Sequence, residues 1–209
     1  APSFLCWLVT NHEGPRQAAP VAAGWPRARA RVVESEEETL MDLVEITRPD
    51  PGVTVLTLNR PDRLNAMDAH LVAALHEALA AVETDRDCHV VVLTGAGRGF
   101  CAGLDLEGYD DRPQQDVGIL DMLQRQRDIA TLPERLHGLR QPVIAAVNGP
   151  AAGGGLALVC ASDIRIAAEP AVFAVSFIRA GFSACDLGVS WLFPRIVGAG
   201  AAHELMLTG

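Results

Sequence analysis

From residue 43 onward, short apolar runs alternate with longer segments of helical periodicity, and this alternation constrains the fold more than any other feature. Residues 89–94 and 142–147 are nearly continuous apolar runs, which are typical of strands buried on both faces. Residues 68–83 instead place their apolar side chains on one helical face, behind Asp68, which can cap the helix. Alternation of this kind predicts an α/β fold whose sheets are covered by helices.

The remaining segments extend this pattern. Residues 43–47 and 53–59 flank a Pro-Asp-Pro-Gly turn and predict a hairpin, because Gly and Pro supply the dihedral angles of a turn. A helix is predicted over 117–139, with an interruption near Pro133. Further predicted elements are a helix over 153–162, a strand over 164–168, and helices over 188–197 and 199–207.

The first 40 residues differ from the rest of the chain. They mix Ala, Pro, Gly and Arg, end in an acidic cluster, and show neither helical nor strand periodicity. Such a composition buries too little apolar area to offset the entropy of ordering. We therefore predict a flexible extension over 1–40 and one domain over 41–209.

Composition excludes several classes of protein. The net charge is −9, and all 17 basic residues are Arg, so the basic footprint of a nucleic-acid-binding protein is missing. No apolar run approaches the roughly 18–20 residues of a membrane span. The five cysteines are scattered and form no pattern typical of a disulfide framework or a zinc site. Buried thiols in a reducing cytoplasm are the expected reading, without nucleic-acid or membrane partners and without a metal.

Two small-residue segments are the candidates for chemistry, at 97–105 and 148–155. Each follows a predicted strand, and the second also opens a predicted helix. Small residues let backbone N–H groups approach a ligand, and a helix N-terminus adds the positive end of its dipole. Side by side, the two could bind one developing oxyanion. From spacing alone, tight turns needed only for packing explain them equally well, and neither is a dinucleotide-binding fingerprint.

Several blocks, taken in order and spacing, resemble the enoyl-CoA hydratase/isomerase (crotonase) family. The blocks lie at 58–61, 65–66, 99–105, 142–149, 153–155, 162–167 and 207–209. The resemblance covers residues 43–209 and implies a spiral of ββα units. Family chains continue past the point that matches Gly209, into helices that form trimers or paired trimers. The resemblance therefore implies a C-terminally truncated chain, without its trimerisation helices, and a homotrimer or hexamer for the full-length form.

The resemblance also implies a site for an acyl-CoA thioester, with coenzyme A as part of the substrate and no separate cofactor. The N–H groups of Ala102 and Gly154 would bind the thioester oxygen. The residues implied for the coenzyme A channel are Asp62, Arg63, Leu64, Ala102, Gly103, Leu104, Asp105 and Gly153.

Two positions depart from the pattern of a hydratase in this family. Hydratases use two glutamates to activate water and to deliver its proton, and here the matching residues are Ala157 and Phe177. Neither side chain can transfer a proton, and each such group contributes about 10²–10⁴-fold to a rate. Ordinary hydration of a 2-enoyl-CoA is therefore not expected from these two positions.

Asp186 is the remaining candidate for proton transfer. Counted back from Gly198, it matches the carboxylate that family isomerases use to move a proton and that dehalogenases use as a nucleophile. A helix cap for the segment that follows is the alternative. The expected function is an isomerase-like acyl-CoA enzyme that stabilises a thioester enolate. A non-catalytic CoA-ester binder, or a hydrolase or dehalogenase with Asp186 as nucleophile, stays open.

Overall fold

The computed structural model describes residues 43–108, 117–183, 185 and 187–209, all of which belong to the unit Glu36–Gly209. The predicted extension over 1–40 and the candidate Asp186 lie outside the described residues. The division of the chain at residue 41 therefore stays a prediction.

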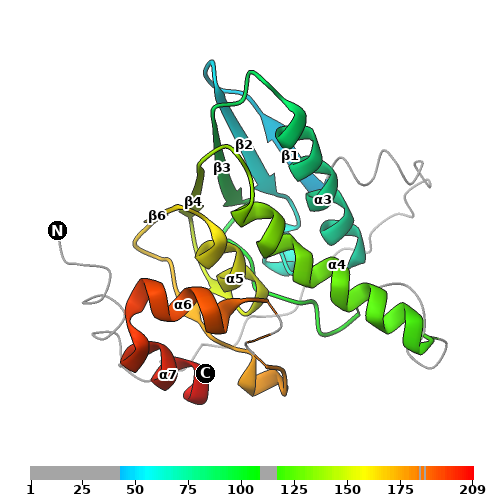
Figure 1. Ribbon diagram of the computed structural model, residues 1–209, viewed down its shortest axis with the longest axis vertical. Helices are drawn as coiled ribbons and strands as arrows, with labels where there is room; N and C mark the ends of the chain where they lie inside the picture. The colour runs from blue at the N-terminus through cyan, green and yellow to red at the C-terminus, as the bar shows by residue number, and fades with distance from the viewer. Residues whose placement is uncertain (1–42, 109–116, 184, 186) are drawn as a thin grey trace, which may run out of the picture. The chain divides into compact units, whose positions relative to one another are not determined.

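A five-stranded sheet in the order β1-β2-β3-β4-β6 forms the framework of this unit (Figure 1). The β1–β2 pair is antiparallel, and the pairs β2–β3, β3–β4 and β4–β6 are parallel. A second, two-stranded sheet pairs β5 with β7. The strands are β1 (Val44–Thr47), β2 (Val53–Leu58), β3 (Val90–Gly95), β4 (Val143–Val147), β5 (Ala151–Ala152), β6 (Ile164–Ala167) and β7 (Phe173–Ala174). Because β3 and β4 are neighbouring parallel strands, the loops after them start at the same edge of the sheet.

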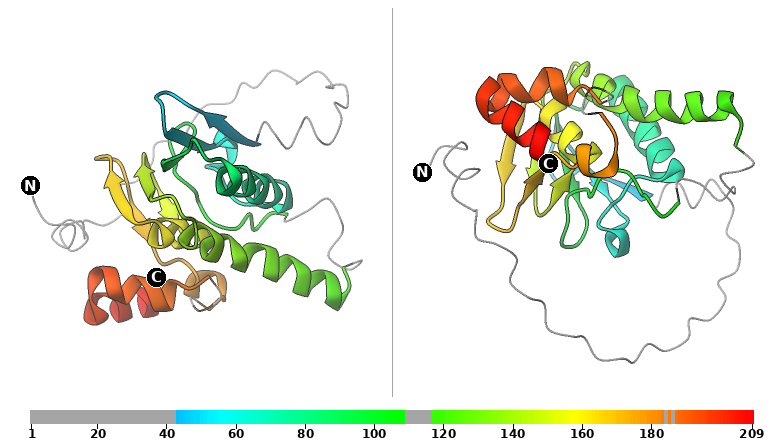
Figure 2. Two further views of the ribbon diagram at one scale, coloured as in Figure 1. Left: turned by 45° about the horizontal axis from the view of Figure 1, so that its top comes forward. Right: turned by 90° about the horizontal axis from the view of Figure 1, so that it is seen from below.

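Helices cover one face of the large sheet, as the two views of Figure 2 show. Helix α3 packs on β1 and β2, α5 packs on β4, and α4 lies against both α3 and α5. Helices α6 and α7 pack against each other, and α6 also contacts α5. The helices are α3 (Ala69–Thr84), α4 (Ile119–His137), α5 (Gly154–Ala161), α6 (Val189–Val197) and α7 (Ala199–Thr208), with short 3-10 turns η1 (Pro61–Arg63) and η3 (Ile178–Ala180).

The core lies between the sheet and these helices. Every second residue of β2, β3 and β4 is buried, and those between them are mostly half-buried. Leu56 and Leu93 are fully buried on the strands, and Leu71 and Leu79 on α3. Period-two burial on the strands and period-3.6 burial on the helix therefore meet in one apolar layer.

Most of the predicted elements are present, with small shifts at their ends. The predicted hairpin is the antiparallel β1–β2 pair. Asp68 caps α3 as predicted, since its carboxylate accepts the N–H of Leu71 at 2.8 Å. The predicted interruption near Pro133 was wrong: α4 continues through this residue. Burial of Ile129 and Leu136 on the same helix offsets the backbone hydrogen bond that proline cannot make.

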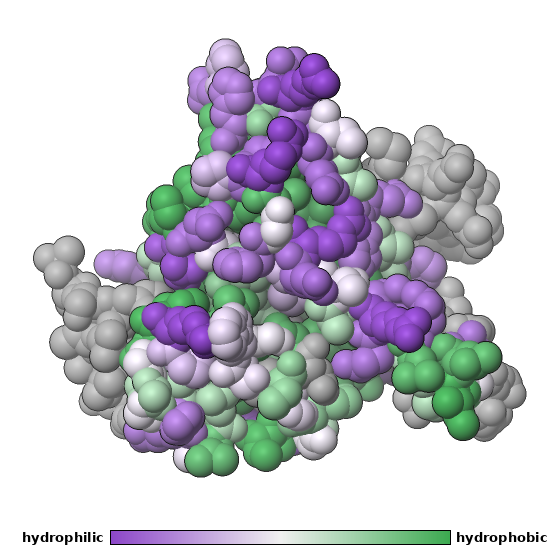
Figure 3. Space-filling model, in the orientation of Figure 1, coloured by the Kyte–Doolittle hydropathy of each residue, from purple (hydrophilic) through white to green (hydrophobic). Residues whose placement is uncertain are grey.

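The N-terminal end of α4 carries an exposed apolar cluster, which forms the green patch at the lower right of Figure 3. Its members, each more than half exposed, are Ile119, Leu120, Met122 and Leu123. The described residues therefore leave this end of the helix uncovered.

Candidate active site

The two glycine-rich loops meet at a single cavity of about 100 Å³. They supply part of its wall through Ala102, Gly103, Leu104, Gly153 and Gly154. The other lining side chains are mainly apolar and come from α4, η3 and the loops: Met67, Leu106, Gln126, Ile129, Ser176, Phe177, Ala180, Phe182 and Leu187. The structure thus brings together five of the residues that the sequence singled out.

Backbone hydrogen bonds fix the first loop on both sides. On one side, the Pro150 carbonyl accepts the N–H groups of Phe100 and Cys101, at 3.0 and 3.1 Å. On the other, the N–H of Met67 donates to the Gly103 carbonyl at 2.7 Å, and the Met67 carbonyl accepts the N–H of Asp105 at 2.9 Å. The loop is therefore held between two segments that are distant in sequence.

These bonds correct the expectation for Ala102. Its N–H donates to the carbonyl of Leu64 at 3.0 Å, so this amide is already paired within the protein. Burial has the larger effect on the Cys101 thiol and raises its pKa, while a backbone hydrogen bond from Gly103 lowers it. The N–H of Leu104 meets no acceptor among the described residues, although Leu104 lines the cavity. The available donor of this loop is therefore two residues further along the chain than predicted.

The backbone of the second loop lies against the backbone of the first, with no side chain between them. Gly154 is the first residue of α5, so its N–H lies at the helix N-terminus, and no described residue accepts it. A Cβ on Gly103 would lie 3.2 Å from the Gly154 nitrogen and 2.8 Å from the Ala152 carbonyl oxygen. Gly103 has a φ of 95°, in the left-handed region that favours glycine. Glycine at this position therefore permits both the turn and the close approach of the two loops.

An ion network around the buried Asp105 carboxylate anchors the end of the first loop. The Asp105 carboxylate accepts from Arg60 at 2.7 Å and from Arg63 at 3.0 Å. Burial raises the pKa of Asp105, but the hydrogen bonds from the two guanidinium groups outweigh burial and lower the pKa to about 2. Arg63 also pairs with Glu107 at 2.6 Å. Asp105 therefore stays ionised and ties the loop to η1.

The cavity wall has little capacity for proton transfer. Phe177 lines the cavity, whereas Ala157 is buried on α5 and does not line it. Among the described lining residues, the polar side chains are those of Ser176 and Gln126 alone. Cys101 beside the cavity is fully buried, and burial raises the pKa of its thiol to about 12, which disfavours the reactive thiolate.

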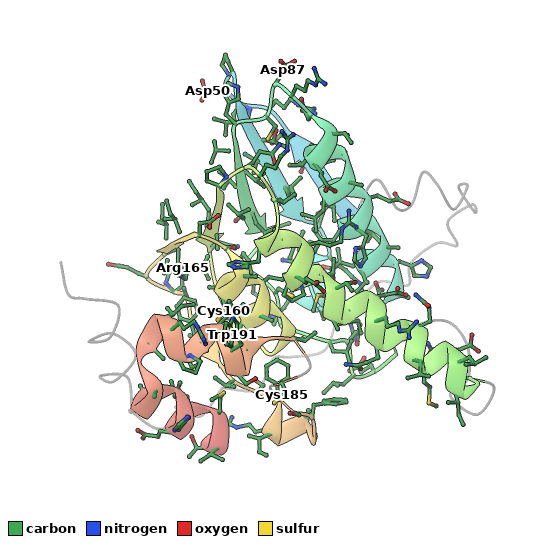
Figure 4. The ribbon with its side chains drawn as sticks, viewed as in Figure 1. Asp50, Asp87, Cys160, Arg165, Cys185 and Trp191 are labelled. Atoms are coloured by element: carbon green, nitrogen blue, oxygen red, sulfur yellow. The ribbon has the colours of Figure 1, made fainter. Side chains whose placement is uncertain are left out.

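Asp186 lies outside the described residues, but Leu187, its neighbour in sequence, lines the cavity. A δ-carbon of Leu187 lies 3.4 Å from the position that a Cβ on Gly154 would take. Figure 4 labels two residues close to Asp186 in the sequence, Cys185 before α6 and Trp191 on α6. Trp191 is 62% exposed, stacks on Arg195 and does not line the cavity. The two candidate roles of Asp186 therefore both remain open.

The residues implied for the coenzyme A channel divide into two groups. Ala102, Gly103, Leu104 and Gly153 line the cavity. Asp62, Arg63, Leu64 and Asp105 lie outside its wall, in η1 and at the end of the first loop, where Arg63 and Asp105 are ion-paired. Contact of this second group with coenzyme A stays a prediction.

Several lining residues were not predicted from the sequence, among them Met67, Gln126 and Ile129. Met67 follows the Asn65-Ala66 block, which was the only signal for it. Gln126 and Ile129 recur three residues apart on α4, a spacing that shows a shared helix face but not a cavity. These residues reach the site only because α4 packs against α5.

The enoyl-CoA hydratase/isomerase family model matches residues 48–209. The chain belongs to the enoyl-CoA hydratase/isomerase family. The crotonase-like fold expected from the sequence is confirmed by solved structures of this family. One of the similar structures is a monofunctional enoyl CoA isomerase from M. smegmatis. It has a TM-score of 0.65 and 40% identity, and the match covers 80% of this chain and 68% of that one.

Two curated relatives carry different names. The probable enoyl-CoA hydratase echA12 of Mycobacterium leprae is 43% identical over 187 residues, which cover 87% of this chain and 63% of the relative. The 1,2-epoxyphenylacetyl-CoA isomerase of Escherichia coli is 43% identical over 164 residues, which cover 78% and 62%. The chain thus spans less than two thirds of the length of either relative.

The described part of this family member contains neither a membrane-spanning helix nor a group of residues for a metal ion. None of its described helices is long and apolar enough to cross a membrane. Within the same described ranges, no group of three or more His, Cys, Asp or Glu side chains could hold a metal ion.

Proposed function

We propose that this chain binds an acyl-CoA thioester and polarises its carbonyl oxygen with the N–H groups of Leu104 and Gly154. The observation that carries the proposal is a pair of backbone amides at one apolar cavity, neither of which has an acceptor among the described residues. A donor of this kind is worth about 10²–10³-fold in rate, because it is preorganised where negative charge develops. Family membership supports the thioester as the ligand.

The reaction that fits best is an isomerase-like proton transfer. A base removes a proton from the carbon beside the thioester, and the electron pair of that C–H bond moves onto the thioester oxygen. Return of the proton to a different carbon shifts the double bond, with no atom gained or lost. Asp186 is the proposed base, because Leu187 lines the cavity and both hydratase positions lack a carboxylate. Relatives named as isomerases support this choice.

One observation favours a second candidate, a CoA-ester binder without catalysis. The described part of the cavity wall carries no carboxylate, imidazole or thiol. If Asp186 only caps α6, the site would retain its oxyanion donors without a base. Assembly of the full-length protein into trimers or hexamers stays a prediction, as does a cytoplasmic location. The acyl group of its substrate stays unassigned.

Exchange of substrate hydrogen for deuterium tests the proposal. We would incubate a panel of saturated and 3-enoyl CoA thioesters with the chain in D₂O and follow the C2 protons by NMR. We expect the wild-type protein to exchange these protons and Asp186→Asn to exchange them more slowly, by about 10²-fold or more. That result supports proton transfer by Asp186. Glu107→Gln is the matched control, since Glu107 is also an acid near the loop but is 79% exposed and paired with Arg63.

The outcomes separate the candidates. Exchange that is unchanged in Asp186→Asn removes this residue from the mechanism. Thioester binding without exchange supports the binder. A protein that neither binds the thioesters nor exchanges their protons contradicts both candidates.

A further inference from the structure

Two asparagine side chains converge on one carbonyl group beneath the candidate site. The carbonyl oxygen of Gly99 accepts the side-chain amide of Asn65 at 2.9 Å and that of Asn148 at 3.1 Å. Gly99 lies in the turn between β3 and the stretch that ends at Leu104. The two amides therefore hold the point at which the first loop leaves the sheet.

Each asparagine uses its whole amide in this way. Asn65 also donates to the Ala96 carbonyl at 3.0 Å, and its side-chain oxygen accepts the N–H of Arg60 at 2.8 Å. Asn148 also donates to the Gly97 carbonyl at 3.0 Å, and its side-chain oxygen accepts the N–H of Gly95 at 3.2 Å. The Asn148 oxygen also accepts the hydroxyl of Thr94 at 3.5 Å. Each side chain thus makes two donor bonds and at least one acceptor bond, a combination that an amide supplies in this arrangement.

The backbone of Asn65 has a second role. Leu64 and Asn65 have φ angles of 52° and 56°, in the left-handed region that few residues other than Gly and Asn adopt readily. This conformation directs the Leu64 carbonyl at the N–H of Ala102, at 3.0 Å. One residue thus shapes the turn that pairs Ala102, and its side chain, fully buried, clamps Gly99.

We infer that Asn65 and Asn148 are positioning residues, which fix the first loop so that the Leu104 N–H faces the cavity. The inference rests on the proposed function. Neither side chain lines the cavity, so both act through the backbone that they hold. A displacement of about 1 Å in such a donor costs on the order of 10²-fold in rate, so loss of the clamp impairs the oxyanion site more than ligand binding.

The test uses acetoacetyl-CoA, a β-keto thioester whose enolate absorbs in the near ultraviolet. Loss of its C2 proton to solvent moves an electron pair onto the carbonyl oxygens, where the proposed amides would stabilise it. In Asn65→Gly, which keeps the left-handed backbone and removes the amide, we expect the enolate-to-keto ratio of the bound probe to fall by about 10-fold or more. The Kd for coenzyme A alone should change by less than about 3-fold.

Gln141→Ala is the matched control. Gln141 is also a buried amide that donates to two backbone carbonyls, those of Val82 and Asp85 at 3.0 and 3.4 Å. It precedes β4, at the edge of the sheet opposite to the site. This variant should lose stability and keep the wild-type enolate ratio. If Asn65→Gly does not fold, Asn148→Ala removes the other half of the clamp from a half-buried position.

The results distinguish failure of the inference from failure of the proposed function. An unchanged enolate ratio in the asparagine variant that folds, or an equal fall in Gln141→Ala, overturns the positioning role. A wild-type protein that binds acetoacetyl-CoA without raising its enolate ratio overturns the proposed oxyanion site, and the positioning role with it.

Discussion

Each loop of the site presents a backbone amide that no described residue accepts, and the two loops do so by different physical means. The loop after β3 is held by hydrogen bonds: its backbone donates to the Pro150 carbonyl and exchanges two bonds with Met67, and two arginines donate to Asp105. The loop after β4 contains three consecutive glycines, and it comes close because no side chain separates it from the first loop. Hydrogen bonds fix one amide, and the absence of side chains admits the other.

The largest effect on stability is expected in the second loop, at a glycine whose surroundings leave no space for a side chain. A Cβ on Gly155 would collide with the Cys101 carbonyl oxygen, which is backbone and cannot move aside. Gly155→Ala should destabilise the fold by on the order of 4 kcal/mol or prevent folding, as measured by chemical denaturation. Gly200→Ala on α7 is the control, because nothing lies within 4 Å of its Cβ position. Equal free energies of unfolding for the two variants would contradict the view that glycine is required at 155 for steric reasons.

The next largest effect is expected on catalysis, when the backbone N–H of Leu104 in the first loop is removed. Leu104→Pro removes the N–H for which the described residues offer no acceptor, and we expect proton exchange on bound thioesters to fall by about 10²–10³-fold. Leu104→Ala keeps the N–H and trims only the side chain, so it should retain most of the exchange rate. The measurement is the initial rate of deuterium uptake by NMR. A similar loss in both variants would assign the effect to packing rather than to the amide.

Loss of the anchor should have a smaller effect, on stability. The pKa of Asp105 is lowered from its usual value of 3.8 to about 2, so the folded state holds the carboxylate ionised where the unfolded state binds a proton. This stabilisation, about 2 kcal/mol, is present above about pH 4 and is lost as the pH falls toward 2. Asp105→Asn should remove it, so that urea titrations of the variant between pH 4 and 2 show a smaller loss of stability than the wild type. If the stability of the variant and of the wild type fell in parallel with pH, the ion network would not contribute this stabilisation.

The smallest effect is expected beside the first loop, at the start of α3. Asp68 accepts the N–H of Leu71 and pairs with Arg60 at 3.1 Å, so it connects the helix cap to the arginine that holds Asp105. Asp68→Ala should cost about 1 kcal/mol of stability in thermal unfolding. Asp68→Asn keeps the cap and removes the charge, and should cost less. An equal loss in the Asn and Ala variants would assign the effect to the ion pair instead, because both substitutions remove the charge.

The sequence by itself determined the strand–helix alternation, the family and the two loops that form the site. Periodicity and glycine are local signals, and they predicted the β1–β2 hairpin, the Asp68 cap and the helix that begins at Gly154. The prediction of an interrupted helix at Pro133 failed because burial of the same helix outweighs a local preference.

Only the tertiary structure decided which amide of the first loop remains available. Ala102 and Leu104 stand in the same motif, and nothing in the motif distinguishes their N–H groups. The acceptor that engages Ala102 is the carbonyl of Leu64, nearly forty residues earlier, placed by a left-handed turn. A backbone hydrogen bond depends on the position of both partners, so a motif read along one segment cannot reveal which donors a distant segment has already taken.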